Sequence, residues 1–204
     1  MNPPASGLQS DIDFLKALAS DSGRLLRRDA ITLVAVGMIF GVNAVLTWAI
    51  FAGYLPQPRS MWLWPYMGAL VLFLAVVLLT NRRFRSATDG AASRAMSTAW
   101  SSVGVTLTVA GVALALASWR LAEPRIMYLF PIVLFAIYGA AWWIAFSVKH
   151  VTWYRFVTAG CFATVLAIGF VAGSPAMWLV LACGLFLFVG VPGLLLLRET
   201  RAEV

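Results

Sequence analysis

Apolar residues in this chain occur as long runs rather than as alternating or amphipathic patterns. Six runs are about 20 residues long, and charged residues lie only at or near their ends. A helix needs about 20 apolar residues to cross roughly 30 Å of hydrocarbon, so each run predicts a transmembrane helix. Transmembrane β-strands would alternate polar and apolar residues, which these runs do not. The predicted spans cover residues 30–53, 61–80, 99–119, 126–148, 153–173 and 176–197.

Composition places these runs in a membrane rather than in the core of a water-soluble globule. Of the 204 residues, 62% are apolar and only 11% are charged. So few polar side chains cannot cover the surface of a water-soluble chain of this size. The expected fold class is an all-α integral membrane protein with six transmembrane helices.

The positively charged residues indicate how the helices are threaded, because Lys and Arg resist translocation and accumulate on the cytoplasmic side. Of the 15 Lys and Arg residues, Arg59, Arg120 and Arg125 fall on one side of the predicted spans, and the rest fall on the other side with both termini. We therefore expect a cytoplasmic N-terminal segment at 1–29, a transmembrane domain at 30–197 and a cytoplasmic tail at 198–204. The net charge of +7 fits this topology and attraction to anionic lipids better than nucleic-acid binding.

One short phrase recurs in the predicted outer turns. "LPQPRSMWLWP" at 55–65 and "LAEPRIMYLFP" at 121–131 agree at six of eleven positions, and "SPAMWLVL" at 174–181 resembles both. Each copy follows an odd-numbered span, which predicts three tandem helical hairpins whose simplest arrangement is a pseudo-threefold bundle. The alternative is three convergent interfacial turns, because Pro breaks helices and Trp and Tyr favour the headgroup level.

Small residues predict the helix contacts, because membrane helices associate where small side chains let backbones approach. The first span has Gly37, Gly41 and Ala44, the fifth has Gly160, Thr164 and Ala167, and the third has Ser97, Ser101, Gly104, Thr108, Gly111, Ala115 and Ser118. We therefore expect the first, third and fifth spans to form the interior. The second and sixth spans, rich in Leu, Phe and Val, are expected to face lipid or a partner, with Pro192 bending the sixth.

The sequence lacks the residue patterns of common catalytic and cofactor sites, such as a Ser-His-Asp triad, HExxH, CxxC or a phosphate-binding Gly loop. His150, the single histidine, cannot supply a bis-histidine haem site. Cys161 and Cys183 lie at different depths of their spans, so we expect two reduced thiols rather than a disulfide or a metal pair. The prediction is a protein that is not an enzyme and holds no cofactor or metal.

A few polar and aromatic residues inside the spans remain as candidate contact positions. Asn43 and Thr47 fit an interhelical hydrogen bond better than a ligand site. If the bundle instead encloses an axial cavity, its lining is expected to be Asn43, Thr47, Thr106, Thr108 and Tyr138. Trp142 and Trp143 are adjacent, and neighbouring helical residues point about 100° apart, so one of them is a candidate partner contact.

The N-terminal segment predicts a short amphipathic helix over residues 10–28. Ser10 and Asp13 form a capping box, and Ile12, Leu15 and Leu18 share one face. Such a helix would lie on the inner leaflet or dock on a cytoplasmic partner, and the first is favoured.

Several stretches resemble a known group of proteins: "DIDFLKALASDSGR", "SRAMSTAWSSVG", "YGAAWW" at 138–143 and "PGLLLLR" at 192–198. They look like a family of small six-helix proteobacterial inner-membrane proteins whose motifs carry no assigned chemistry. The resemblance implies a bacterial inner (plasma) membrane location and six spans. A looser resemblance is to six-helix membrane anti-sigma factors, which also have a short cytoplasmic N-terminal helix.

Two functions of different classes follow from these observations. The favoured one is a non-enzymatic membrane interaction protein, an accessory subunit or regulator, whose partners are membrane lipids and another protein or further copies of itself. The alternative is a small transporter or a lipid- or small-molecule-binding protein with a cavity on the bundle axis.

Overall fold

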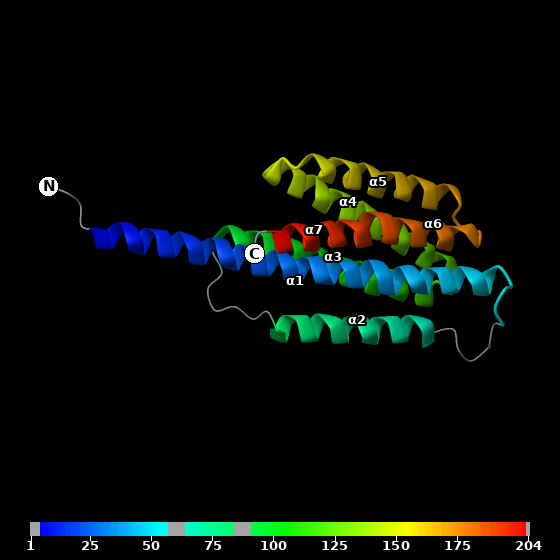
Figure 1. The fold of residues 1–204 in the computed structure, drawn as a ribbon. Helices are drawn as coiled ribbons and strands as arrows, with labels where there is room; N and C mark the ends of the chain where they lie inside the picture. The colour runs from blue at the N-terminus through cyan, green and yellow to red at the C-terminus, as the bar shows by residue number, and fades with distance from the viewer. Residues whose placement is uncertain (1–4, 57–63, 84–90, 203–204) are drawn as a thin grey trace.

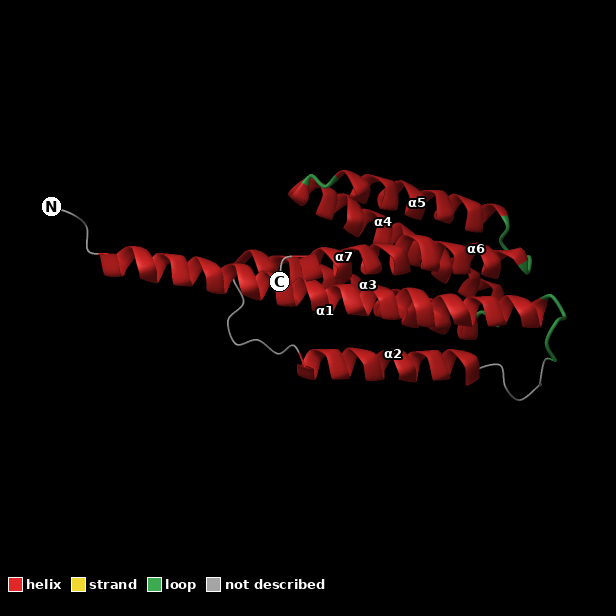
Figure 2. Ribbon diagram, viewed as in Figure 1, coloured by secondary structure: helices red, strands yellow, loops and turns green. Residues whose placement is uncertain are grey.

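The computed structural model describes residues 5–56, 64–83 and 91–202, and every regular element in these ranges is helical (Figure 2). The elements are α1 (Ala5–Phe51), α2 (Trp64–Arg83), α3 (Ala91–Arg120), the 3₁₀ helix η1 (Pro124–Tyr128), α4 (Leu129–Lys149), α5 (Thr152–Phe170), α6 (Ala176–Leu185), the π-helical η2 (Phe186–Gly190) and α7 (Val191–Ala202).

Five helical segments are long and apolar enough to cross a membrane, which supports the predicted multi-pass membrane architecture. They are Arg27–Phe51, Trp100–Arg120, Pro124–Ser147, Thr152–Phe170 and Ala176–Glu199. At the predicted second span, the described apolar stretch is the shorter Gly68–Thr80 within α2.

Successive spans lie along one common axis and alternate in direction, with α6, η2 and α7 together forming the last span (Figure 1). The chain therefore enters the bundle through α1 and leaves it through α7 at the same end, which we call the terminal end. The turns after α1, α3 and α5 lie at the opposite end, which we call the hairpin end.

α1 is much longer than a membrane crossing requires. Its 47 residues correspond to about 70 Å at 1.5 Å per residue, against about 30 Å of hydrocarbon. Its N-terminal half projects beyond the other helices at the terminal end (Figure 1). The segment 10–28 is thus helical and continues into the first span without a break, while its amphipathic side chains lie outside the described residues.

The sixth span packs centrally, so the expectation that it faces lipid or a partner rather than the interior was wrong. α6, η2 and α7 pack extensively against α1, and α6 also contacts α5. The side chains of Met177, Val189 and Pro192 are almost completely buried. Leu and Phe dominate this span by number, but its position is set by the glycines Gly184 and Gly193, whose missing side chains admit neighbouring helices.

The glycines of α1 and α6–α7 make the closest of these helix contacts. A Cβ added at Gly37 would lie 2.5 Å from Gly190 Cα, and one added at Gly193 would lie 2.8 Å from the backbone nitrogen of Val34. Gly41 lies against the ring of Phe186. The small-residue row predicted for the first span therefore is a packing face, and its partner is the sixth span.

A change of helical type precedes Pro192 in the sixth span. The backbone N–H of Val191 bonds Phe186 O, five residues earlier, which closes the π-helical turn η2. Pro lacks an N–H and its ring crowds the carbonyl of residue i−4, so a widened turn before Pro192 accommodates it.

α3 shows the reverse of what its small-residue row predicted. No residue in its most apolar 18-residue stretch is buried, and Ser101, Gly104, Thr108 and Ala115 are exposed. The side chains of α3 that pack on the core are larger, and include Trp100, Val103 and Leu107. Large side chains fill the space toward α4 with more dispersion contacts than small ones would. The predicted interior position of the third span was therefore wrong.

The odd-numbered helices do not gather around one axis as a pseudo-threefold bundle would require. α1 and α5 lie on either side of α6 (Figure 1), and α3 packs mainly on α4 and little on α1. α4 and α5 form the most extensive helix pair among the described residues.

α2 packs on α1, where the rings of Phe73 and Phe40 have centroids 5.6 Å apart. It leaves Val71, Leu78 and Leu79 exposed, as expected for the second span.

Two of the three repeated turns can be compared at the hairpin end. In the second copy, the Glu123 side chain accepts the Arg125 N–H at 3.2 Å and caps η1. Tyr128 and Trp178, the aromatic residues that follow Met in the second and third copies, meet edge to face with ring centroids 6.5 Å apart. Most of the first copy, 57–63, lies outside the described residues.

Candidate functional site

Five aromatic residues from three helices form a cluster toward the terminal end. They are Trp100 of α3, Tyr138 and Trp142 of α4, and Trp153 and Tyr154 of α5. Trp142 is the centre, with ring centroids 5.4 Å from Trp100, 5.6 Å from Trp153 and 5.1 Å from Tyr154. Trp100 also approaches Tyr138 at 6.2 Å. The cluster joins α3, α4 and α5 where they meet.

Trp142 and Trp143 occupy different environments, as their spacing of about 100° around the helix predicts. Trp142 is 1% exposed, whereas Trp143 is 54% exposed. A partner can therefore reach Trp143 directly, but it can reach Trp142 only by displacing the aromatic cluster. Of the two candidate contact residues, only Trp143 lies on an accessible surface.

The indole nitrogen of Trp142 is buried without a hydrogen-bond partner in the described part of the chain. An unpaired buried donor costs about 1–3 kcal/mol. Its neighbours are the ring faces and edges of Trp100, Trp153 and Tyr154, which offer at most a weak N–H···π contact. The indole is thus held by packing rather than by hydrogen bonding.

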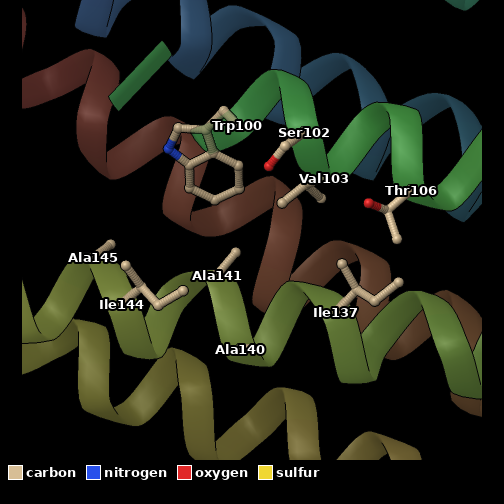
Figure 3. Close-up of a pocket in the computed structure, with 9 residues that line it drawn as sticks. All are labelled: Trp100, Ser102, Val103, Thr106, Ile137, Ala140, Ala141, Ile144 and Ala145. Carbon is tan, nitrogen blue, oxygen red and sulfur yellow. The ribbon is translucent and has the colours of Figure 1, made fainter. Parts of the chain in front are cut away.

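A groove of about 210 Å³ runs between α3 and α4 beside this cluster (Figure 3). Side chains from the two helices point toward one another across it (Figure 3). The lining residues are Trp100, Ser102, Val103 and Thr106 of α3, and Ile137, Ala140, Ala141, Ile144 and Ala145 of α4. The lining is mostly apolar, and its polar side-chain atoms are two hydroxyls and one indole nitrogen.

The polar residues proposed for an axial cavity are not brought together. Asn43 and Thr47 are buried within α1, and the Thr47 hydroxyl donates to Asn43 O at 2.8 Å. Thr106 lines the α3–α4 groove, whereas Thr108 is exposed and donates to Gly104 O at 2.8 Å. Tyr138 is buried next to Trp100. These five side chains therefore occupy separate places rather than one site.

Sequence reasoning missed the groove and could have found part of it. Ala140, Ala141 and Ala145 share one side of α4 and leave room that Ile137 and Ile144 border. A run of alanines between larger residues on a membrane helix is a usable signal for such a recess. What the sequence could not supply is the facing helix, because α3 turns Trp100 and Val103 toward α4 while Ser101, Gly104, Thr108 and Ala115 stay exposed.

Contacts at the terminal end link α4, α5 and α7. Trp153 Nε1 donates to Glu199 Oε1 at 3.3 Å, which ties the start of α5 to α7. The Arg155 guanidinium carbon lies 4.8 Å from the centre of the Phe146 ring at the end of α4, a distance suited to a cation–π contact.

Within the described ranges, no group of three His, Cys, Asp or Glu residues could hold a metal ion. Cys161 is buried, Cys183 is exposed, and both are free thiols. His150 follows α4 in the left-handed backbone conformation with φ 53° and ends that helix. Its place in the fold is that of a helix C-cap.

Comparisons of this chain with protein-family models, with curated proteins and with solved structures give no match.

Proposed function

We propose that this chain is a non-enzymatic membrane interaction protein, an accessory subunit or regulator, and that the outward face of α3 binds a transmembrane helix of its partner. The observation that carries the proposal is the exposure of Ser101, Gly104, Thr108 and Ala115 on that face. Small residues at these spacings let a second backbone approach closely, which is how membrane helices associate.

Comparison with the other glycines of the spans shows why the exposure of Gly104 is unusual. Most glycines of the spans lie against side chains or backbone of a neighbouring helix, as Gly139 does against Phe162 and Gly184 against Phe135, although Gly169 of α5 also has open space. A Cβ added at Gly104, in contrast, would have no atom of another residue within 4 Å. Most glycines of the spans therefore make close helix contacts. At Gly104 the helix surface is open, so another chain can make such a contact there.

The buried hydroxyls favour this proposal over an axial transport pathway. Thr47, Thr158 and Thr164 each donate to the carbonyl four residues earlier, at 2.8, 2.9 and 2.8 Å. Their donors are used within their own helices, whereas carriers expose polar groups that bind what they move.

The proposed topology has six spans with both termini in the cytoplasm of a bacterial cell and the protein in its inner membrane. The described cations support this orientation: Arg27, Arg82 and Arg198 are exposed at the terminal end, while Arg120 and Arg125 lie at the hairpin end. The excess at the terminal end fits a cytoplasmic position of that end.

Site-specific photo-crosslinking in native membranes tests the α3 proposal. A photoreactive amino acid at Gly104 or Thr108 is expected to give one protein adduct of defined mass. The matched control is Leu166 of α5, which is 75% exposed on a helix that the proposal leaves to lipid. Adducts with lipid alone at all three positions would contradict the proposal.

A further inference from the structure

The N-terminal part of α1 points to an interaction surface outside the membrane. The membrane span of α1 begins at Arg27, and the preceding helix, 5–26, continues for about 33 Å beyond the other helices (Figure 1). We call this part the α1 extension. We propose that the α1 extension binds in an apolar cleft of a cytoplasmic protein, and that acidic side chains border this cleft and meet the basic terminal end.

The apolar positions of the α1 extension continue the side of α1 that packs into the bundle. In the span, this side carries Ala30 and Leu33, which are buried, and Gly37, which lies against Gly190. At 100° per residue, these three positions fall within an arc of about 60° around the helix. The positions of the extension in the same arc are Leu8, Ile12, Leu15, Ala19 and Leu26. The packing side of α1 therefore continues beyond the helices that cover it.

The continuity of α1 favours a protein over the inner leaflet as the neighbour of this surface. α1 is one unbroken helix from Ala5 to Phe51, so the extension leaves the membrane in the direction of the span (Figure 1). To lie on the leaflet, the extension would have to turn sharply near Arg27, which would break the helix there. The inference differs here from the expectation drawn from the sequence, and its cytoplasmic side rests on the orientation proposed above.

A second copy of this chain does not fit on the same surface. Two copies in one membrane are related by an axis along the membrane normal, so their α1 helices run parallel. The apolar positions of the extension lie on the side of α1 on which α6, η2 and α7 pack in the span. The straight α1 of a second copy would therefore enter the space of these helices. The partner must instead sit on the terminal end of the bundle without continuing into the membrane.

The charge of the terminal end favours an acidic partner. Arg82 of α2, Arg155 of α5 and Arg198 of α7 are exposed at this end. The nearby carboxylate of Glu199 accepts the hydrogen bond of Trp153 Nε1. A partner that rests on this end meets a basic surface, and Asp and Glu side chains around its cleft would complement that surface. An apolar cleft that receives one face of an amphipathic helix is a common mode of protein recognition.

Site-specific photo-crosslinking of the full chain in intact cells tests this inference. The probe is a photoreactive amino acid at Leu15 or Ala19, on the apolar side of the extension. Ala17 is the matched control, because it is also an alanine and lies about 160° around the helix from Ala19. Both probes are expected to give the same protein adduct, crosslinked in a segment that is apolar and flanked by Asp and Glu. The control should not give that adduct.

Charge variants test whether the basic end contributes to binding. Arg82→Gln and Arg198→Gln should each lower the adduct yield at Ala19 roughly twofold to fivefold, which corresponds to one exposed ion pair. Arg125→Gln at the hairpin end should leave the yield unchanged. Two independent arginine variants keep the test decisive if one folds poorly.

Several results would overturn the inference. They are an adduct with lipid or with a second copy at Ala19, no protein adduct there, equal yields at Ala17 and Ala19, or a yield that neither arginine variant lowers. The α3 contact proposed above is probed at Gly104 and Thr108, on a different helix. Either proposal can therefore fail while the other stands.

Discussion

Gly160 of α5 lies directly beneath the ring of Phe188 in η2, in the space that a β-carbon at residue 160 would need. The same arrangement recurs between Gly184 and the ring of Phe135, where a Cβ would lie 2.6 Å from Phe135 Cζ. Apolar side chains gain little by leaving lipid for one another, so the free energy of helix association depends on such close fits. Pairing a glycine with a phenylalanine on the next helix is a recurring packing device of this bundle.

Gly160→Ala should therefore destabilise the purified protein. The Phe188 ring must shift to admit the methyl group, and overpacking of this kind typically costs about 1–3 kcal/mol. Thermal unfolding in detergent, followed by circular dichroism, measures the loss. Gly104→Ala is the matched control, because it adds the same methyl group in open space and should leave the stability equal or slightly higher.

The contact between Gly37 and Gly190 predicts an asymmetric pair of variants. A Cβ at Gly37 would lie 2.5 Å from Gly190 Cα and 2.9 Å from Leu185 O, so the helix backbones themselves must separate. A Cβ at Gly190 would have its nearest contact at 3.6 Å. Gly37→Ala should lower the unfolding temperature more than Gly160→Ala does, and Gly190→Ala should change it little. Equal effects of Gly37→Ala and Gly190→Ala on the unfolding temperature would show that α1 and η2 are not packed in this way.

Because the indole nitrogen of Trp142 is unpaired, the free energy of unfolding should depend on which residue replaces Trp142. Trp142→Phe keeps an aromatic ring and removes the buried donor, so the loss of packing is offset by about 1–3 kcal/mol of relieved desolvation. Trp142→Ala leaves a cavity among the rings of Trp100, Trp153 and Tyr154 and should cost about 3–5 kcal/mol. Denaturant unfolding monitored by far-ultraviolet circular dichroism compares them, with the exposed Trp143→Leu expected to be near neutral. If the Phe variant proves as unstable as the Ala variant, the nitrogen has a partner.

Ala122 at the hairpin end adopts a backbone conformation that favours glycine, with φ 51°. A residue with a β-carbon pays about 1–2 kcal/mol in the left-handed region, and Gly53 and Gly173 occupy the corresponding region after α1 and α5. Ala122→Gly removes this strain and should raise the free energy of unfolding. The gain should be about 1 kcal/mol or less, because the greater entropy of glycine in the unfolded chain offsets part of it. A drop in stability would place Ala122 in a different conformation.

The sequence was sufficient for the helical membrane class and for the packing faces of the first and fifth spans. Gly37, Gly41 and Gly160 predicted close contacts, and each makes one. The sixth span was misread because Gly184 and Gly193 are outnumbered by Leu and Phe, and average composition conceals two well-placed gaps in a helix. Packing depends on where the small residues sit, not on how many large ones surround them.

The third span shows a second limit of predicting helix packing from the sequence. A row of small residues on one helix does not identify the helix that covers it. Trp100, Val103 and Leu107 on the adjoining face pack toward α4, so Ser101, Gly104, Thr108 and Ala115 remain exposed, whereas Gly111 lies against Phe130. The groove was not predictable for the same reason, because it needs the positions of two helices at once.

The most direct test of the central claim, that α3 binds another protein, is the mass of the intact assembly after gentle extraction from the native membrane, for the wild type and for Gly104→Leu. The account predicts a stoichiometric protein partner, either a different chain or a second copy, that is present in the wild type and lost in the variant. A wild-type chain that leaves the membrane alone, or a partner that Gly104→Leu retains in full, would contradict it.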